Sequence, residues 1–332
     1  MEGSNHTAGT GMKQLSVIII SYNTRDILKE CLRRVMDYGR DLDMETIVVD
    51  NASTDGSPVM VRKTFPEVTL ITSPKNLGFA AGNNLGLKRA SGRFLLLLNS
   101  DAYLMPGVLQ STLQWMNTHP RCGILGVKLT GEDGSLQPSA RRLPNPLRKL
   151  LTISGAAARF PESRVLGETD HSAQRHAKTR ETAWVPGAFF LIRREVVEDI
   201  GFLDERYFLY FEEIDFCLRA RRAGWKIFYY PHARVIHLGG ESSKRTNKPI
   251  SRSGWQLIRY RLESEFRYYR KNFGCVYVLA AAGTEFLWHF LVWTRNRLNG
   301  IRRREKTDRA YFMMRAIVNT LIRDRFGLGV SG

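Results

Sequence analysis

The stretch FLLLLNSDAYL, residues 94–104, is the part of the sequence that decides the fold. Five apolar residues are followed directly by Asn99, Ser100 and Asp101. A short apolar run bounded by polar residues is typical of a strand buried on both faces of a parallel sheet. The three polar residues then stand beyond the carboxyl end of that strand, where open parallel sheets bind ligands.

Similar strand patterns occur at residues 15–21, 44–50 and 68–73, with helical patterns between them. Apolar residues recur at helical spacing over residues 27–35, and residues 58–65 suit a second, shorter helix. Strand, helix and strand repeated in this way predict an α/β fold with a mostly parallel sheet and right-handed crossovers.

The rest of the chain divides by composition. Residues 1–13 are polar and predict a disordered tail, and residues 14–265 predict one α/β domain. Within it, residues 131–183 are rich in Arg, Pro, Ser and Ala, and predict a long loop on the acceptor side. Residues 266–332 alternate apolar and basic stretches and predict a helical extension.

Charge and cysteine content narrow the class of protein. The 332 residues carry 50 Lys and Arg against 32 Asp and Glu, a net charge of +18, which predicts contact with polyanions or an anionic surface. The four cysteines lie far apart, which excludes a C-x-x-C zinc site or a disulfide framework and favours a reduced, cytoplasmic setting. The polar start lacks the apolar core of a signal peptide.

Polar residues follow three of the predicted strands at corresponding positions. Such residues often cap helices or begin turns, which is the alternative interpretation at any one strand. Three strand ends in register favour a ligand site instead. The residues are Ser21, Tyr22 and Asn23, then Asp50 and Asn51, then Asn99, Ser100 and Asp101.

Six segments between residues 15 and 243 together resemble the family 2 glycosyltransferases of the GT-A fold, particularly their bacterial rhamnosyltransferase-like members. They are SVIIISYN, IVVDNASTDGS, NLGFAAGNNLG, LLLLNSDAYL, YFEEIDFCLRARRAGW and ARVIHLGGES, in the family's order. The resemblance implies a GT-A sheet flanked by helices and a nucleotide-diphosphate sugar donor.

The resemblance also implies a metal site. Asp101 resembles the acid of the family's D-x-D motif, written N-S-D here, so Asn99 replaces the first acid. His237 resembles the family's late metal-binding histidine, although a lone histidine after a strand is more often structural. Mg²⁺ or Mn²⁺ held there would neutralise charge on the leaving nucleotide diphosphate.

Several residues are expected to contact the donor. Asp50 resembles the family's base- and ribose-contacting aspartate. In NLGFAAGNNLG the glycines permit close backbone approach and the Asn amides offer donors and acceptors, whereas the alternative is a helix start packed against the sheet. The expected donor contacts are Ser21, Tyr22, Asn23, Asp50, Asn51, Asn76, Gly78, Phe79, Asn83, Asn99 and Ser100.

The acidic cluster FEEIDF is the candidate for the chemical step. By resemblance Glu213 aligns with the family's catalytic base, and Asp215 is the second choice for base or a residue that orients Arg219 or the acceptor. The alternative is a solvated acidic first turn that is favourable to the helix dipole.

Glu212, Trp184, Gly187 and Ala188 are the expected acceptor contacts, although a core strand explains residues 189–192 equally well. One base implies an inverting single displacement.

Residues 273–293 are almost continuously apolar and just long enough to cross a bilayer. Glu285 and His289 interrupt this stretch, and residues 295–325 carry ten basic residues against three acidic ones. An interfacial helix on an anionic membrane is therefore the preferred interpretation. Packing against the catalytic domain ranks second and a membrane span last.

These features predict an inverting, metal-dependent transferase that moves a sugar, preferably L-rhamnose from dTDP-rhamnose, to a polyprenyl-diphosphate-linked saccharide at the inner face of the plasma membrane. Alternatives are a non-catalytic nucleotide-sugar-binding module, motivated by Asn99 and Glu213, and a transferase that uses UDP- or GDP-sugars on a soluble acceptor. No nucleic-acid partner is expected, because the basic residues lie largely in the apolar tail. The pattern does not specify an oligomeric state.

Overall fold

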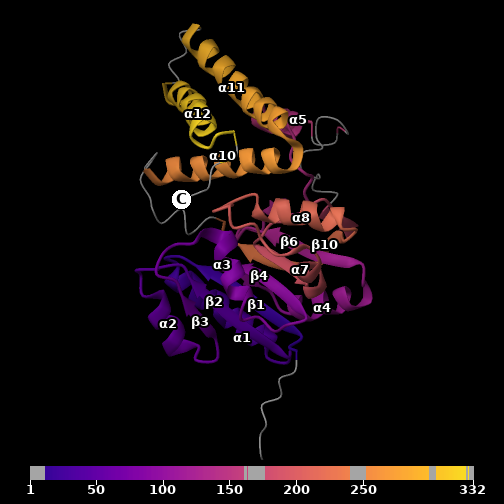
Figure 1. Cartoon of the computed structure of the whole chain (residues 1–332). Helices are drawn as coiled ribbons and strands as arrows, with labels where there is room; N and C mark the ends of the chain where they lie inside the picture. The colour runs from indigo at the N-terminus through magenta and orange to yellow at the C-terminus, as the bar shows by residue number, and fades with distance from the viewer. Residues whose placement is uncertain are drawn as a thin grey trace, which may run out of the picture.

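The computed structural model describes residues 12–160, 163, 176–239, 252–298, 304–326 and 328. The expected tail at residues 1–13 falls almost entirely outside these ranges, as does part of the expected loop at residues 131–183. One sheet forms the core, in the strand order β3-β2-β1-β4-β9-β6-β10-β5, with β7 added to β6 and β8 added to β10 (Figure 1).

The first half of the sheet is parallel, as predicted. Its strands are β1 (Leu15–Ser21), β2 (Met44–Asp50), β3 (Thr69–Thr72) and β4 (Phe94–Asn99). They are joined through α1 (Arg25–Gly39), α2 (Ser57–Thr64) and α3 (Gly78–Leu87). Ser21 pairs with Asp50, and Ile20 pairs with Asn99. The polar residues that end these three strands therefore lie along one edge of the sheet.

The second half of the sheet is mixed. β9 (Phe189–Arg193) runs antiparallel between β4 and β6 (Cys122–Thr130), and all five of its residues are buried, so this segment is a core strand. The other elements are β5 (Ala102–Leu104), α4 (Val108–Thr118), β7 (Leu136–Gln137), β8 (Arg180–Glu181), α7 (Arg194–Ile200), α8 (Glu212–Arg222) and β10 (Lys226–His237).

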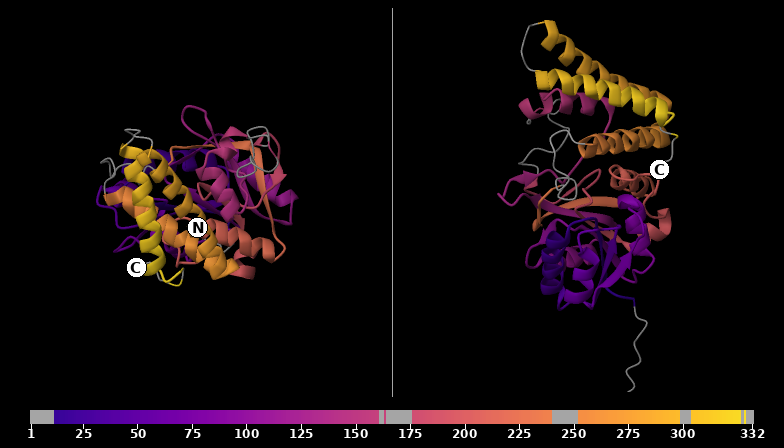
Figure 2. Two further views of the ribbon diagram at one scale, coloured as in Figure 1. Left: turned by 90° about the horizontal axis from the view of Figure 1, so that it is seen from above. Right: turned by 90° about the vertical axis from the view of Figure 1, so that its left-hand side faces the viewer.

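Three long helices follow the sheet domain: α10 (Arg252–Phe273), α11 (Cys275–Leu298) and α12 (Arg304–Arg323). Figures 1 and 2 show α10 lying between the sheet domain and an outer layer formed by α11, α12 and α5 (Pro146–Ile153), which is followed by the short α6 (Ala156–Arg159). The expected boundary between residues 265 and 266 falls inside α10, which continues across it.

Buried ion pairs join the outer layer to α10. Lys149 Nζ on α5 lies 2.7 Å from Glu265 Oε2 on α10, and Arg261 lies 2.8 Å from Glu285 Oε1 on α11. Glu285, which interrupts the apolar stretch, is thus buried among helices. By length and composition α11 is the one helix among the described residues that could cross a membrane.

Candidate active site

A pocket of about 470 Å³ opens at the carboxyl edge of the parallel strands. Strand ends form its floor, and α10 covers it with Gln256, Leu257 and Tyr260. Tyr260 stacks obliquely on Phe208, with ring centroids 4.5 Å apart. Residues separated by more than 200 positions therefore enclose one cavity.

Asn99, Asp101 and His237 meet in this pocket. β5 pairs antiparallel with β10 and sets His237 opposite Ala102, the residue after Asp101. His237 Nε2 lies 3.4 Å from Asp101 Oδ1 and 3.5 Å from Asn99 Nδ2. The turn after β4 and the end of β10 thus bring together the residues of the N-S-D motif and the histidine that the sequence analysis singled out.

Gln137 on β7 orients the ring of His237. The Gln137 amide nitrogen donates to the His237 carbonyl oxygen at 2.8 Å, so its amide oxygen must face the ring. That oxygen lies 2.8 Å from His237 Nδ1, which therefore carries the proton and donates to it. In the neutral ring Nε2 is left with a lone pair directed at a carboxylate oxygen.

A proton or a cation between Asp101 Oδ1 and His237 Nε2 would relieve the contact between these two acceptor atoms, and Nε2 also lies within reach of the Asn99 amide nitrogen. A carboxylate oxygen and an imidazole nitrogen suit Mn²⁺ or Mg²⁺, and the backing amide of Gln137 is typical of a metal-binding histidine. Among the described residues no group of three or more His, Cys, Asp and Glu side chains is placed to hold a metal. A cation bound by Asp101 and His237 would therefore take further ligands from a substrate, as Mg²⁺ commonly does with phosphates.

Seven of the eleven expected donor contacts line the pocket: Tyr22, Asn51, Asn76, Gly78, Phe79, Asn99 and Ser100. Asn51 also shapes the wall, because its amide nitrogen donates to the Gly78 carbonyl and its oxygen accepts from the Leu77 amide. Gly78 has φ of +79°, and an added Cβ would lie 2.3 Å from the Phe208 carbonyl oxygen. Only glycine fits this approach.

The other four expected donor contacts are not among the residues that line the pocket. Asp50 is 3% exposed; its Oδ2 accepts from the Ser53 amide, and its Oδ1 has no hydrogen-bond partner among the described residues. Ser21 bonds Thr24, and Asn23 Oδ1 accepts from the Thr54 amide. Asn83 is fully buried and donates to the Phe79 carbonyl within α3, which matches the helical alternative.

Glu212 and Glu213 begin α8, directly after two strained residues. Tyr210 and Phe211 have φ of 71° and 70°, values that are rare outside glycine and that gather at functional sites. Tyr210 lines the pocket. The backbone thus turns sharply where the two acids enter the structure.

Burial raises the pKa of Glu213 to about 6, although the positive charge of Arg141 lowers it. Burial also raises the pKa of Glu212 well above its usual value, and the negative charge of Glu213 adds to that rise. Atom Oε2 of each glutamate is buried without a hydrogen-bond partner in the described part of the chain. Glu212 is buried and Glu213 is half-buried with one carboxyl oxygen buried, so the pair is not a fully solvated first turn.

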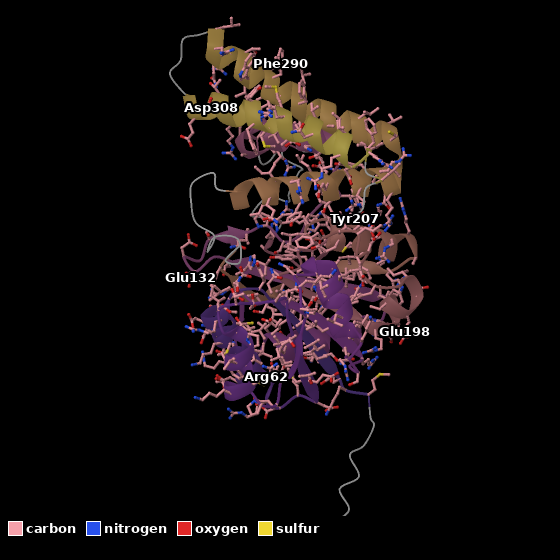
Figure 3. The ribbon with its side chains drawn as sticks, turned by 60° about the vertical axis from the view of Figure 1, so that its left-hand side comes forward. Arg62, Glu132, Glu198, Tyr207, Phe290 and Asp308 are labelled. Carbon is pink, nitrogen blue, oxygen red and sulfur yellow. The ribbon has the colours of Figure 1, made fainter. Side chains whose placement is uncertain are left out.

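Asp215 is fully buried away from the pocket, at the junction of α8 with α10. Its carboxylate contacts Arg219 Nε at 3.0 Å, Lys271 Nζ at 2.8 Å and Asn272 Nδ2 at 3.1 Å. Tyr207, labelled beneath α10 in Figure 3, lies 3.4 Å away through its hydroxyl. This arrangement matches the expected orientation of Arg219 and ties two helices together.

The three expected acceptor contacts near β9 do not line the pocket directly. Trp184 is 8% exposed, donates to the Arg142 carbonyl at 2.9 Å and is covered by the Arg141 guanidinium. Gly187 lies beside Phe79, where an added Cβ would meet the ring at 3.1 Å. Ala188 is buried and its carbonyl accepts from the backbone N–H of Asn99.

Sequence reasoning missed much of the pocket wall and the residue that orients the histidine. Phe208 and Leu209 lie just before the acidic cluster FEEIDF and outside it. The α10 residues lie outside every motif. Only an aromatic-rich helical pattern at residues 256–269 signalled a buried face. The missed residues are Ile20, Gln137, Phe208, Leu209, Tyr210, Gln256, Leu257 and Tyr260.

Sequence comparison finds related families and proteins. The family model described as glycosyl transferase family 2 matches residues 16–201, and that of glycosyl transferase family group 2 matches residues 156–315. An N-acetylglucosaminyl-diphospho-decaprenol L-rhamnosyltransferase of Mycobacterium tuberculosis is 27% identical over 242 residues, covering 70% of this chain and 78% of the relative. A low-salt glycan biosynthesis hexosyltransferase, Agl10 of Haloferax volcanii, is 25% identical over 263 residues, covering 78% and 75%.

Solved structures with the same fold carry nucleotide ligands and Mn²⁺. The mannosyltransferase PcManGT from Pyrobaculum calidifontis, with GDP-Man and Mn²⁺, superposes with a TM-score of 0.53 at 18% identity, covering 94% of this chain and 88% of that one. GalNAc-T7, with UDP, GalNAc and Mn²⁺, gives 0.53 at 14% identity, covering 79% and 48%. The predicted GT-A architecture is therefore confirmed.

Proposed function

Because the chain belongs to glycosyl transferase family 2, we propose that it transfers a sugar from a nucleotide diphosphate to a polyprenyl-diphosphate-linked saccharide, with inversion at the anomeric carbon. The observation that carries this proposal is the convergence of Asn99, Asp101 and His237 on one pocket at the carboxyl edge of the sheet. The rhamnosyltransferase relative favours L-rhamnose, from dTDP-rhamnose, as the sugar.

The chain's own residues support a single displacement. Glu213 accepts the proton of the acceptor hydroxyl, and that oxygen attacks the anomeric carbon while the bond to the nucleotide diphosphate breaks. Asp101 and His237 would hold a divalent cation, which supplies positive charge to the leaving diphosphate. The nucleotide leaves as an anion, so a second carboxylic acid is not needed for protonation.

The outer helices support a membrane location for this reaction. α5, α11 and α12 expose large apolar side chains, a set we call the apolar face. Basic residues of α11 and α12, among them Arg295, Arg297 and Arg315, stand on the same helices. Apolar burial combined with basic charge is the pattern of interfacial binding to anionic lipid. The apolar face comprises Leu147, Leu150, Val276, Leu279, Leu287, Phe290, Leu291, Val318 and Ile322.

A donor panel tests the function. dTDP-, UDP- and GDP-sugars would be incubated with Mn²⁺, with and without prenyl-diphosphate-GlcNAc, and nucleotide release measured for the wild type, Asp101→Ala and the exposed control Asp41→Ala. We expect acceptor-dependent release from dTDP-rhamnose that Asp101→Ala abolishes and Asp41→Ala retains. Nucleotide binding without transfer from any donor would favour the non-catalytic module.

The linkage tests the stereochemistry. NMR of the product would give the anomeric configuration of the transferred sugar relative to the donor. Inversion is expected with one base, whereas retention would contradict the proposed role of Glu213.

A further inference from the structure

The pocket of about 470 Å³ at the sheet edge, which we call the donor pocket, has one side made of apolar and aromatic residues. We call this side the aromatic wall. Its four residues are half-buried, so part of each side chain remains exposed to the pocket that it lines. Neither the proposed metal ligands nor the proposed base belongs to this wall. The aromatic wall comprises Phe208, Leu209, Leu257 and Tyr260.

Contacts within the protein hold Phe208 in place. Its carbonyl oxygen accepts from the backbone N–H of Phe79 at 2.8 Å, which ties it to the start of α3. The next carbonyl, that of Leu209, accepts from the Ser264 hydroxyl of α10 at 2.9 Å. The segment is therefore fixed between α3 and α10 before a ligand enters, and a preorganised wall loses less conformational entropy on binding.

Tyr260 adds a hydroxyl group to the wall. Its ring packs against Phe208, with centroids 4.5 Å apart, and the Arg259 guanidinium lies 5.4 Å from the ring centre. The Tyr260 hydroxyl and the Gln256 amide share a hydrogen bond of 2.6 Å. A phenol hydroxyl both donates and accepts, so one bond to Gln256 leaves it capacity for a second bond to a ligand in the pocket.

The aromatic wall adjoins the proposed base. Phe208 precedes Glu213 by five residues, and Tyr210, which lies between them, also lines the pocket. In the proposed reaction the anomeric carbon lies between a diphosphate near Asp101 and an acceptor oxygen near Glu213. The transferred sugar is therefore expected in the part of the pocket that borders this segment.

The floor of the donor pocket accounts for the rest of the donor. Asn51 follows β2, Tyr22 follows β1, and Asp101 lies in the turn after β4, and these three strands are neighbours in that order. Ligands of open sheets lie beyond the carboxyl ends of such strands. A nucleoside above β2 and β1, with its diphosphate at Asp101, would cover the floor and leave the aromatic wall to the sugar.

A pyranose ring matches a wall of this kind. One of its faces carries mainly C–H groups, which pack well on the flat face of an aromatic ring. Its edge carries hydroxyl groups, which exchange hydrogen bonds with a phenol. A flat ring beside a hydroxyl therefore suits a saccharide better than it suits a phosphate, which requires positive charge.

We propose that Phe208 and Tyr260 bind the transferred sugar of the donor, Phe208 through its ring and Tyr260 through its hydroxyl. Both residues determine donor specificity and take no proton in the reaction. This inference rests on the proposed function for the class of ligand. It also gives α10 a direct role in donor binding.

A comparison of nucleotides with nucleotide sugars isolates this contact. Calorimetry of the full-length chain with Mn²⁺ and no acceptor would pair dTDP with dTDP-L-rhamnose, UDP with UDP-GlcNAc and GDP with GDP-mannose. For the nucleotide sugar that binds most tightly, Tyr260→Phe should weaken binding about 5- to 10-fold and leave the affinity for its nucleotide unchanged. Tyr311→Phe, at an exposed position of α12, is the matched control.

Phe208→Leu is the second variant, because it removes the flat ring and keeps an apolar side chain. We expect the same nucleotide sugar to bind about 3- to 10-fold more weakly, again with unchanged affinity for the nucleotide. Phe160→Leu, at an exposed position after α6, is its control. Thermal melts would check folding, and Tyr260→Phe retains the ring that packs on Phe208 if Phe208→Leu is unstable.

Two results would overturn the proposal. Equal losses of affinity for the nucleotide and the nucleotide sugar would place the nucleobase, and not the sugar, on the aromatic wall. Wild-type affinity of a folded variant for the nucleotide sugar would overturn the assignment of the residue that it replaces.

Transfer assays with prenyl-diphosphate-GlcNAc separate this inference from the proposed function. A sugar-dependent loss of binding in a chain that transfers nothing would contradict the function and retain the sugar site. Transfer to the acceptor, with donor affinity unchanged in both variants, would retain the function and overturn the inference. A chain that binds none of the three nucleotide sugars would contradict both.

Discussion

Glu213 is the proposed base of the chemical step. It is half-buried, and its Oε2 is buried without a hydrogen-bond partner among the described residues, so this oxygen is available to accept a proton. Glu213→Gln keeps the shape and removes the basic oxygen. We expect kcat to fall by about 10²- to 10⁴-fold, the usual contribution of a general base, with nucleotide binding unchanged. Glu198→Gln on the exposed part of α7 is the control, and a Glu213→Gln enzyme of normal kcat would assign the base elsewhere.

The raised pKa of Glu213, about 6, predicts a pH profile. A base works deprotonated, so kcat/KM should rise with pH up to about 6 and level off above it. Stability should respond in the opposite direction, because between the usual glutamate pKa of 4.5 and about 6 the folded chain holds a proton that the unfolded chain has released. This contribution to the free energy of unfolding decreases as pH rises through that window. A kcat/KM that falls between pH 5 and 7 would contradict the assignment.

Gln137 is the positioning residue for His237. Gln137→Leu removes the acceptor for the Nδ1 proton and frees the ring to turn. We expect Mn²⁺ affinity, measured as free Mn²⁺ by electron paramagnetic resonance, to fall by about 10- to 100-fold. Gln114→Leu, on an exposed turn of α4, should leave it unchanged. Equal Mn²⁺ affinity in Gln137→Leu and the wild type would show that His237 is not oriented in this way.

At the scale of elements, the contact between α8 and α10 holds the pocket together. Asp215 joins Arg219 of its own helix to Lys271 and Asn272 of α10, whose other end covers the donor pocket. α10 therefore belongs to the catalytic unit, although its sequence lies beyond the motifs of the family.

Asp215→Asn tests this junction against the second-choice role of Asp215 as the base. Removing one partner of a buried ion-pair network typically costs about 3–5 kcal/mol, and we expect a loss near the lower end because Lys271 is partly exposed. Urea unfolding would measure the change against Glu198→Gln. An Asp215→Asn protein of wild-type stability that binds nucleotide and transfers nothing would assign the base to Asp215.

At the scale of the whole molecule, the outer layer gives the protein two chemically different ends. The apolar face lies on α5, α11 and α12, and the sheet domain lies at the other end (Figure 2). Glu285 is buried by Lys149 and Arg261, so the charge that interrupts the apolar stretch is satisfied inside the protein. This leaves the opposite side of α11 apolar.

Negative charges introduced on the apolar face test whether this face binds a membrane. Leu287→Asp with Leu291→Asp places two carboxylates on exposed positions of α11, where no core packing is lost. We expect sedimentation with phosphatidylglycerol vesicles to drop about tenfold or more, since both apolar burial and attraction to anionic lipid are reduced. Val59→Asp, on exposed α2, is the control. If vesicle binding is unchanged, and the wild type is a dimer in solution whereas the variant is a monomer, the apolar face is a subunit interface instead.

The sequence by itself determined the family, the parallel half of the sheet and the chemical type of most site residues. Strands buried on both faces have continuous apolar runs, and glycosyltransferase motifs are local strings, so both are visible without a structure. The polar strand ends, Asp101 among them, were predicted as neighbours because parallel strands end at one edge. His237 was expected at the same site only from the resemblance to the family.

Only the tertiary structure decided which polar residues face the pocket, what closes it and which acid is available. Asn83 and Asp215 belong to the same motifs as their pocket-lining neighbours, yet neither lines the pocket. Asn83 donates to the Phe79 carbonyl within α3, and Asp215 is bound by Arg219 and Lys271. Gln137 and Tyr260 come from segments without a motif and reach the site through strand pairing and helix packing. The contact of Gln137 with His237 joins positions 100 residues apart, and that of Tyr260 with Phe208 joins positions 52 residues apart. The energy of such contacts depends on burial and geometry that local residue patterns do not encode.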